Sequence, residues 1–125
     1  MILVDTSVWV DHLRRGDDRL IALLESALVL IHPFVIGEIV CGSLADRKTM
    51  LDLLQDLPQV AVAETDEVMA FIESRRLWGK GIGYVDVHLL AAVALTGGAS
   101  LWTRDKRLRT AAKSLKLAFE AGDRR

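Results

Sequence analysis

Short apolar runs alternate along this chain with longer segments in which apolar residues recur every three or four positions. The short runs predict buried strands, and the longer segments predict helices that bury one face. Strands are expected at residues 1–4, 28–31, 59–63, 100–103 and 115–119. Helices are expected at residues 7–14, 18–26, 34–43, 46–56, from Thr65 onward, 84–96 and 105–113. This alternation predicts an α/β fold, a three-layer sandwich in which helices flank a central parallel sheet of about five strands.

Length and composition predict that residues 1–125 form a single domain. The chain has 125 residues, of which 51% are hydrophobic, and this is enough for one core. The single cysteine, Cys41, excludes an internal disulfide framework and fits the reducing cytoplasm, where we expect the protein. No signal peptide is expected, because the chain opens on a strand with no basic region before it. The longest uncharged stretch, 87–103, is interrupted by Gly97 and Gly98, so it predicts a helix and a strand rather than a membrane span.

The net charge of −1 gives no global sign of nucleic-acid binding, but the charges are unevenly distributed. One acid, Asp105, is surrounded by a basic patch: Arg104, Lys106, Arg107, Arg109, Lys113 and Lys116. A local patch of this kind can hold phosphate groups. A second basic group either extends this patch or is a solvated helix end: Arg75, Arg76 and Lys80.

Two acids follow predicted strands. Asp5 comes directly after the first strand and precedes Thr6 and Ser7, and Asp105 lies just past the fourth strand. Ligands of parallel α/β sheets collect at the carboxyl ends of the strands. The two acids therefore suggest a metal site at this edge of the sheet.

Two further acids lie on predicted helices among apolar neighbours. Glu38 has no charged residue three or four positions away, and Asp86 opens a helix whose face continues through Leu89 and Val93. We expect both carboxylates to face the core, where a charge is costly unless it is paired or binds a metal. Each acid also has a simpler interpretation: helix caps for Asp5 and Asp105, a first-turn acid for Asp86, and a distant arginine as partner for Glu38. All four together favour a single site.

Four carboxylates in one place need a counter-charge. Two unit charges about 4 Å apart repel by roughly 4 kcal/mol at an effective dielectric near 20. Several such pairs exceed the marginal stability of a small domain, so either some acids are protonated or a cation is bound. Oxygen ligands favour Mg²⁺ or Mn²⁺ over zinc. Such ions hydrolyse phosphodiesters by lowering the pKa of the attacking water and stabilising the leaving oxygen.

The segments that carry these residues resemble the PIN domain and, more closely, a VapC-type toxin of a bacterial toxin–antitoxin pair. The matching segments are Asp5-Thr6-Ser7, Glu38 on its apolar helix, Tyr84 to Ala92 and Leu101 to Leu108. The resemblance implies an endoribonuclease that depends on Mg²⁺ or Mn²⁺, is usually a homodimer, and is inhibited by a cognate VapB-type antitoxin.

The resemblance also implies which residues act. It places the catalytic and metal-binding acids at Asp5, Glu38, Asp86 and Asp105, with Asp5 and Asp86 as the principal ligands. Supporting hydroxyl groups are expected from Thr6, Ser7 and Thr103. The basic patch would then bind the substrate phosphates through Arg104, Lys106 and Arg107.

Two other functions stay open at this point. A phosphotransfer enzyme or a signalling receiver needs a second acid near the end of the first strand, but Ser7 stands two positions after Asp5. A non-catalytic module that binds RNA or a protein partner would keep the basic patch without needing buried acids, and its binding would be indifferent to Mg²⁺.

The remaining notable residues have structural interpretations. The histidines share no ligand spacing and are expected to be structural or exposed: His12, His32 and His88. We expect four other side chains in the core: Trp9, Trp78, Trp102 and Cys41. The helix at 46–56 is amphipathic, and its apolar stripe could face either the core or a partner.

Overall fold

Three short parallel strands form the centre of the molecule. The computed structural model describes residues 1–120, and residues 121–125, at the end of the predicted domain, lie outside the described residues. The strands are β1 (Ile2–Val4), β2 (Val29–Leu30) and β3 (Ser100–Trp102), in the order β2-β1-β3. Ile2 of β1 lies opposite Val29 on one side and Ser100 on the other. A parallel sheet with both faces covered needs apolar strands, and the run Ile-Leu-Val supplies one.

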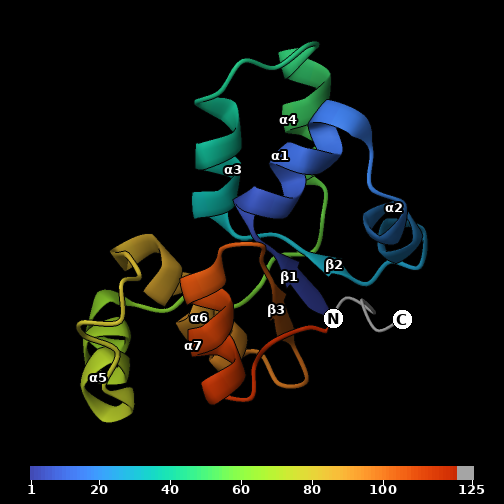
Figure 1. Ribbon diagram of the computed structural model, residues 1–125. Helices are drawn as coiled ribbons and strands as arrows, with labels where there is room; N and C mark the ends of the chain where they lie inside the picture. The colour runs from blue at the N-terminus through green and yellow to red at the C-terminus, as the bar shows by residue number, and fades with distance from the viewer. Residues whose placement is uncertain (121–125) are drawn as a thin grey trace.

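Helices flank this sheet, so the predicted α/β class is confirmed. They are α1 (Thr6–Arg15), α2 (Asp18–Glu25), α3 (Pro33–Val40), α4 (Arg47–Gln55), α5 (Thr65–Arg75), α6 (Tyr84–Leu95) and α7 (Lys106–Ser114). Figure 1 shows α1, α3 and α4 together in the upper part of the view and α5, α6 and α7 in the lower part. The carboxyl end of β1 points to the junction between these two groups.

The prediction of about five strands is wrong in detail. The segments expected as outer strands, 59–63 and 115–119, each contribute one isolated parallel bridge, Ile31 with Gln59 and Leu101 with Ala118. The first segment leaves the sheet because the amide of Ala61 donates to the hydroxyl of Thr96 at 3.0 Å. The second is interrupted by Lys116, whose φ of 61° is a left-handed conformation that no strand contains.

The core forms between the sheet and α6. Leu89 and Leu90 of α6 are fully buried, as are Leu3 and Val4 of β1. Every residue of α6 from Val87 to Val93 is buried, which explains the long uncharged stretch in the sequence. Within residues 1–120, the helices are too short or too polar to cross a membrane.

Two of the expected core residues are exposed. Trp9 and Trp102 are buried as predicted, but Trp78 is 59% exposed and Cys41 is exposed. Cys41 caps the end of α3, after the last helical residue, so it does not share the buried face of that helix. Trp78 lies in the turn that follows α5.

Candidate functional site

Asp5 is a buried acid at the carboxyl end of β1. Its amide donates to the carbonyl of Trp102 at 2.9 Å, which continues the pairing of β1 with β3, and its carbonyl accepts from Val8 in the first turn of α1. The side chain is nearly enclosed, with 7% of the residue exposed. Its Oδ2 accepts hydrogen bonds from Ser7 Oγ at 2.8 Å and from Thr103 Oγ1 at 2.7 Å. Burying a carboxylate is costly unless it is hydrogen-bonded, and these two donors offset that cost.

Ser7 and Thr103 each donate their only hydroxyl proton to Asp5. Each hydroxyl has a single proton, and both protons go to Asp5. The oxygens then act as acceptors, Ser7 Oγ from the amide of Arg104 at 3.0 Å and Thr103 Oγ1 from the amide of Asp105 at 3.1 Å. The 3.3 Å contact between the two hydroxyls therefore needs no hydrogen bond of its own. Both donors converge on Oδ2 of Asp5, so within residues 1–120 its second oxygen is available to a ligand.

Glu38 lies on α3 and is joined to α1 by Thr6, whose hydroxyl donates to Glu38 Oε1 at 2.6 Å. The expectation that Glu38 faces the core is wrong, because the side chain is exposed. The buried face of α3 is made by Val35 and Ile39. Glu38 directly precedes Ile39, so it points to a different side of the helix.

Asp86 and Asp105 each begin a helix. Asp86 Oδ2 accepts from the amide of Gly83 at 3.1 Å in the first turn of α6, and Asp86 is half-buried. Asp105 caps α7, where its Oδ1 accepts from the amide of Leu108 at 2.9 Å, and it is exposed. The capping interpretation is therefore correct for Asp105, and it does not exclude a ligand on the other oxygen.

Asp86 lies within electrostatic range of the other three acids. Burial raises the pKa of Asp86 above its ordinary value, and the charges of Asp5, Asp105 and Glu38 raise it further, against the lowering effect of the Gly83 amide. In the part of the chain that the structure describes, none of the four forms an ion pair with a lysine or arginine. Negative charge therefore gathers here, and within residues 1–120 no ion pair neutralises it.

The chemistry of these donors fits a divalent cation, although the side chains do not yet form a complete cage. Across residues 1–120, no three acidic, histidine or cysteine side chains stand close enough together to hold a metal ion as they are. The donors are carboxylate oxygens, which hard cations such as Mg²⁺ prefer. A cation would also remove the mutual repulsion that raises the pKa of Asp86.

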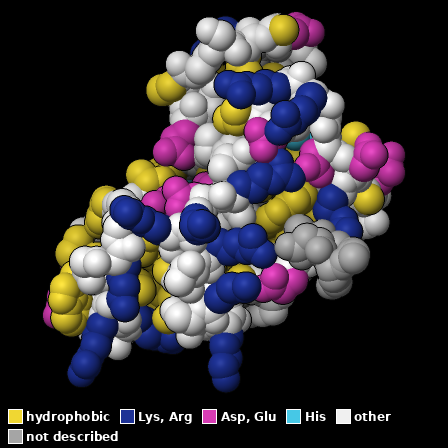
Figure 2. Space-filling model, viewed as in Figure 1, with side chains coloured by type: hydrophobic (Ala, Val, Ile, Leu, Met, Phe, Trp, Pro, Cys, Tyr) yellow, Lys and Arg dark blue, Asp and Glu magenta, His cyan; other side chains and the backbone are white. Residues whose placement is uncertain are grey.

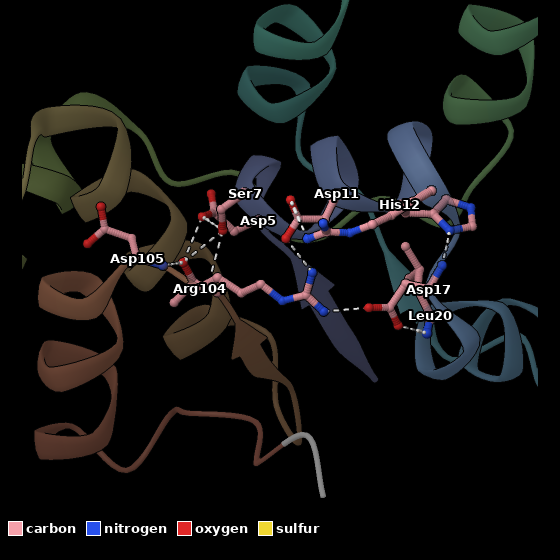
Figure 3. A network of polar contacts seen from close by, with 10 residues as sticks. Asp5, Ser7, Asp11, His12, Asp17, Leu20, Arg104 and Asp105 are labelled. Carbon is pink, nitrogen blue, oxygen red and sulfur yellow. Dashed lines mark hydrogen bonds and ion pairs between the residues drawn. The ribbon is translucent and has the colours of Figure 1, made fainter. Parts of the chain in front are cut away.

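The guanidinium of Arg104, a predicted phosphate-binding group, pairs with two acids in the folded chain. Its guanidinium is held between two acids, with Nη1 at 2.7 Å from Asp11 and Nη2 bonded to Asp17, and Figure 3 shows it reaching away from Asp5 toward α2. It also stacks on Trp102, 5.4 Å from the ring centre. The guanidinium is thus already neutralised by two carboxylates. Sequence analysis missed Asp11 and Asp17, because they lie 93 and 87 positions from Arg104.

The other two predicted phosphate-binding side chains remain available. Lys106 and Arg107 are exposed in the first turn of α7, directly after Asp105. Within residues 1–120, neither pairs with a carboxylate. Positive charge therefore borders the acidic site on the side of α7.

Comparison with known proteins identifies the family. Residues 2–114 match the family model described as the PIN domain. The chain belongs to the PIN domain family. This PIN domain is 55% identical over 111 residues to Ribonuclease VapC32 of Mycobacterium tuberculosis, in the strains CDC 1551 / Oshkosh and H37Rv, and the match covers 89% of this chain and 90% of the relative.

Solved structures share the fold of this PIN domain. The crystal structure of FitAcB from Neisseria gonorrhoeae has a TM-score of 0.63 at 24% identity, over 97% of this chain and 98% of that chain. The crystal structure of PAE2754 from Pyrobaculum aerophilum has a TM-score of 0.58 at 20% identity, over 90% of this chain and 79% of that chain. The predicted resemblance to PIN domains of the VapC type is thereby confirmed.

Proposed function

We propose that this PIN domain is an endoribonuclease dependent on Mg²⁺ or Mn²⁺ that serves as the toxin of a VapBC-type toxin–antitoxin pair. The observation that carries the proposal is the group of four acids around the buried Asp5, which has no lysine or arginine counter-ion among the described residues. The identity of 55% to a protein named as a ribonuclease supports the same reaction.

Each acid has a role in this proposal. Asp5 and Asp86 are the principal metal ligands, and Glu38 and Asp105 complete the coordination directly or through water. The bound cation would lower the pKa of an attacking water and stabilise the leaving oxygen. Ser7 and Thr103 fix Oδ2 of Asp5, so that the other carboxylate oxygen keeps one orientation toward the cation. Thr6 orients Glu38 in the same way.

The basic side chains bind the substrate phosphates. Lys106 and Arg107 are exposed beside Asp105 and suit this role. Arg104 is a positioning residue, because its amide donates to Ser7 while its guanidinium is occupied by Asp11 and Asp17.

The partners follow from the same assignment. A cognate VapB-type antitoxin inhibits the enzyme, and the chain forms a homodimer. Toxin and antitoxin act in the cytoplasm. Large exposed apolar side chains, among them Phe34, Met69 and Tyr84, offer surface for such contacts. Light scattering of the purified chain measures the homodimer directly, and a monomer mass at high concentration would contradict it.

The test of the proposed function is cleavage of structured RNA with Mg²⁺, with Mn²⁺ and with a chelator. Wild type is compared with Asp5→Asn and Asp86→Asn, and Asp52→Asn is the control, because Asp52 is an exposed acid on α4. We expect metal-dependent cleavage in wild type and control and none in the two site variants. RNA binding that is indifferent to Mg²⁺, with no cleavage under any condition, would instead favour a non-catalytic binding module.

A further inference from the structure

A basic cleft opens between the end of α5 and the first turns of α7. Its volume is about 320 Å³, and six of the residues that line it are Arg75, Leu77, Lys80, Lys106, Arg107 and Ala111. Leu77 and Ala111 are buried and form an apolar floor. Figure 2 shows lysine and arginine side chains gathered over this half of the molecule, below the acidic groups.

The charge of this cleft is uniformly positive. Four of its lining residues are cations, and none of the residues that line it is acidic. Within the described part of the chain, none of these four cations forms an ion pair with a carboxylate. Arg75 lies over the ring of Phe71, 5.5 Å from its centre, a contact that orients the guanidinium without neutralising it. Four like charges around one hollow repel one another, and a bound polyanion would relieve that repulsion.

The side chain of Arg107 lies against Gly81, in the loop between α5 and α6. A Cβ atom at Gly81 would stand 2.6 Å from Cδ and 2.7 Å from Nη1 of Arg107, so the arginine lies directly across the glycine backbone. Gly81 also has a φ of 78°, which L side chains rarely adopt. Two residues further along, the amide of Gly83 donates to Asp86. One short loop therefore positions both a cation of the cleft and a carboxylate of the acidic site.

The cleft is continuous along the chain with the acidic site. Lys106 directly follows Asp105, and the loop at 79–83 leads directly into α6 and Asp86. We infer that the cleft is a second binding site, in which Arg75, Lys80, Lys106 and Arg107 hold the backbone phosphates of an RNA strand that flanks the bond to be cleaved. This inference rests on the proposed function, and it deepens that function by adding Arg75 and Lys80 on α5 and its loop.

An RNA strand fits this cleft better than an acidic polypeptide does. The backbone of a nucleic acid presents one negative charge for each nucleotide, a regular series that can follow a row of cations out from the acidic site. The apolar floor of Leu77 and Ala111 offers a surface for the ribose or base between phosphates.

The test measures RNA binding apart from cleavage. All proteins carry Asp5→Asn, and the probe is a fluorescein-labelled single-stranded RNA of mixed sequence, titrated at several salt concentrations. The test variant adds Arg75→Gln and Lys80→Gln. The control adds Arg47→Gln and Lys48→Gln, which remove the same charge from one exposed arginine and one exposed lysine on α4, outside the cleft. Thermal unfolding checks that both variants are folded.

We expect the test variant to bind the RNA severalfold more weakly than the control. The slope of log Kd against log salt becomes shallower by about 0.7 for each phosphate contact that is lost. In the background with Asp5 intact, the same two substitutions raise KM and leave kcat unchanged, because they remove binding that is equal in the ground and transition states.

Three results would overturn the inference. The first is equal RNA affinity and equal salt slope in test and control variants, even if wild type cleaves RNA. The second is an absence of RNA binding in the protein that carries Asp5→Asn alone. The third uses poly-glutamate as a second probe. A test variant that loses binding to poly-glutamate but keeps its binding to RNA would assign the cleft to an acidic polypeptide. A wild type that binds RNA through the cleft but does not cleave it would contradict the proposed function and leave the cleft intact.

Discussion

Thr103 connects the two strands that meet at the acidic site. Its hydroxyl donates to Asp5 and accepts from the amide of Asp105, so one side chain fixes a carboxylate on β1 and the start of α7. The residue is buried, and water cannot replace either bond. We therefore expect the hydroxyl at this position to serve the acidic site, which strand propensity alone would not require.

Replacing Thr103 by valine tests this role, because valine keeps the shape and removes the hydroxyl. We expect cleavage to fall by about 10-fold to 100-fold, as is usual when a group that orients a metal ligand is lost. The free energy of unfolding should fall by about 1 kcal/mol. Cleavage assays and urea unfolding measure the two effects. Thr49→Val is the control, since the exposed Thr49 hydroxyl donates to the side chain of Asp46 at the start of α4, and an equal loss in both variants would contradict the role of Thr103.

His32 predicts a dependence of stability on pH. Burial, and then the charge of His88, lowers the pKa of His32 to about 4 from its ordinary 6.5. The neutral ring caps α3, with Nδ1 accepting from the amide of Phe34 at 3.0 Å. The unfolded chain thus takes up a proton before the folded chain does. The stability that His32 contributes is present above pH 6.5 and is lost as the pH falls toward 4.

The full loss attributable to His32 is roughly 3 kcal/mol of unfolding free energy. Urea unfolding between pH 7 and pH 4 measures the loss, and His32→Asn should reduce it, because asparagine caps a helix without titrating. The ring protons of His32 in NMR spectra should show no titration between pH 7 and pH 5. A midpoint near the ordinary value would contradict the burial argument.

At the scale of residues, the sequence predicts which side chains could form a site better than it predicts how exposed those side chains are. The position of Asp5 after a strand and the position of Asp86 in the first turn of a helix could be predicted. The exposure of Glu38 could not, because its apolar neighbours say nothing of which side of α3 faces the core. The ion pairs of Arg104 with Asp11 and Asp17 join positions so far apart that only the folded chain brings them together.

At the scale of elements, helices were easier to predict than strands. All seven predicted helices are present, because periodicity and caps such as Asp17 and Asp105 are local signals. The helix expected at 34–43 ends early, at Val40. The two outer strands failed because pairing depends on a distant partner. Ala61 bonds a hydroxyl of α6 instead of a neighbouring strand, and no pattern in 59–63 reveals that competitor.

The loop between α5 and α6 offers a matched pair of glycine substitutions. Gly79 and Gly81 both have a positive φ, but only Gly81 has Arg107 lying against it. We expect Gly79→Ala and Gly81→Ala each to cost roughly 1 kcal/mol of unfolding free energy. Only Gly81→Ala should weaken RNA binding, since it alone displaces Arg107. Fluorescence anisotropy with labelled RNA measures the affinity of both variants. Equal affinities would show that Arg107 does not need its contact with Gly81 to bind RNA.

At the scale of the whole molecule, Arg104 links the start of the chain to its end. Its guanidinium joins the loop after β3 to Asp11 on α1 and to Asp17, the cap of α2. Burial alone would raise the pKa of Asp17, but the hydrogen bond and charge of Arg104, together with the amides of Leu20 and Arg19, lower it overall. This single side chain therefore stabilises the packing of three segments.

Arg104→Gln should lower the unfolding free energy at neutral pH by about 1 kcal/mol, because the side chain is partly exposed and solvent screens its ion pairs. The lowered pKa of Asp17 means that this stability is present above the ordinary value of 3.8 and is lost as the pH falls below it. The difference in unfolding free energy between variant and wild type should then shrink in acid. Urea unfolding at pH 7 and pH 3 measures this difference, and Arg104→Lys should recover only part of it, since one ammonium group cannot bridge both acids. A difference that does not narrow at all between pH 7 and pH 3 would show that packing on Trp102, rather than charge, is what Arg104 contributes.

The hydrogen bond between Thr103 and Asp5 joins residues 98 positions apart, so it depends on the order in which the chain is synthesised. A ribosome releases Asp5 well before β3, which lies beside β1 in the sheet. Until then Asp5 lacks one of its two hydroxyl donors, and Asp105 is absent. A nascent or prematurely terminated chain therefore has no assembled site. We therefore expect a nascent chain to be inactive toward the RNA around it until β3 and Asp105 have been synthesised.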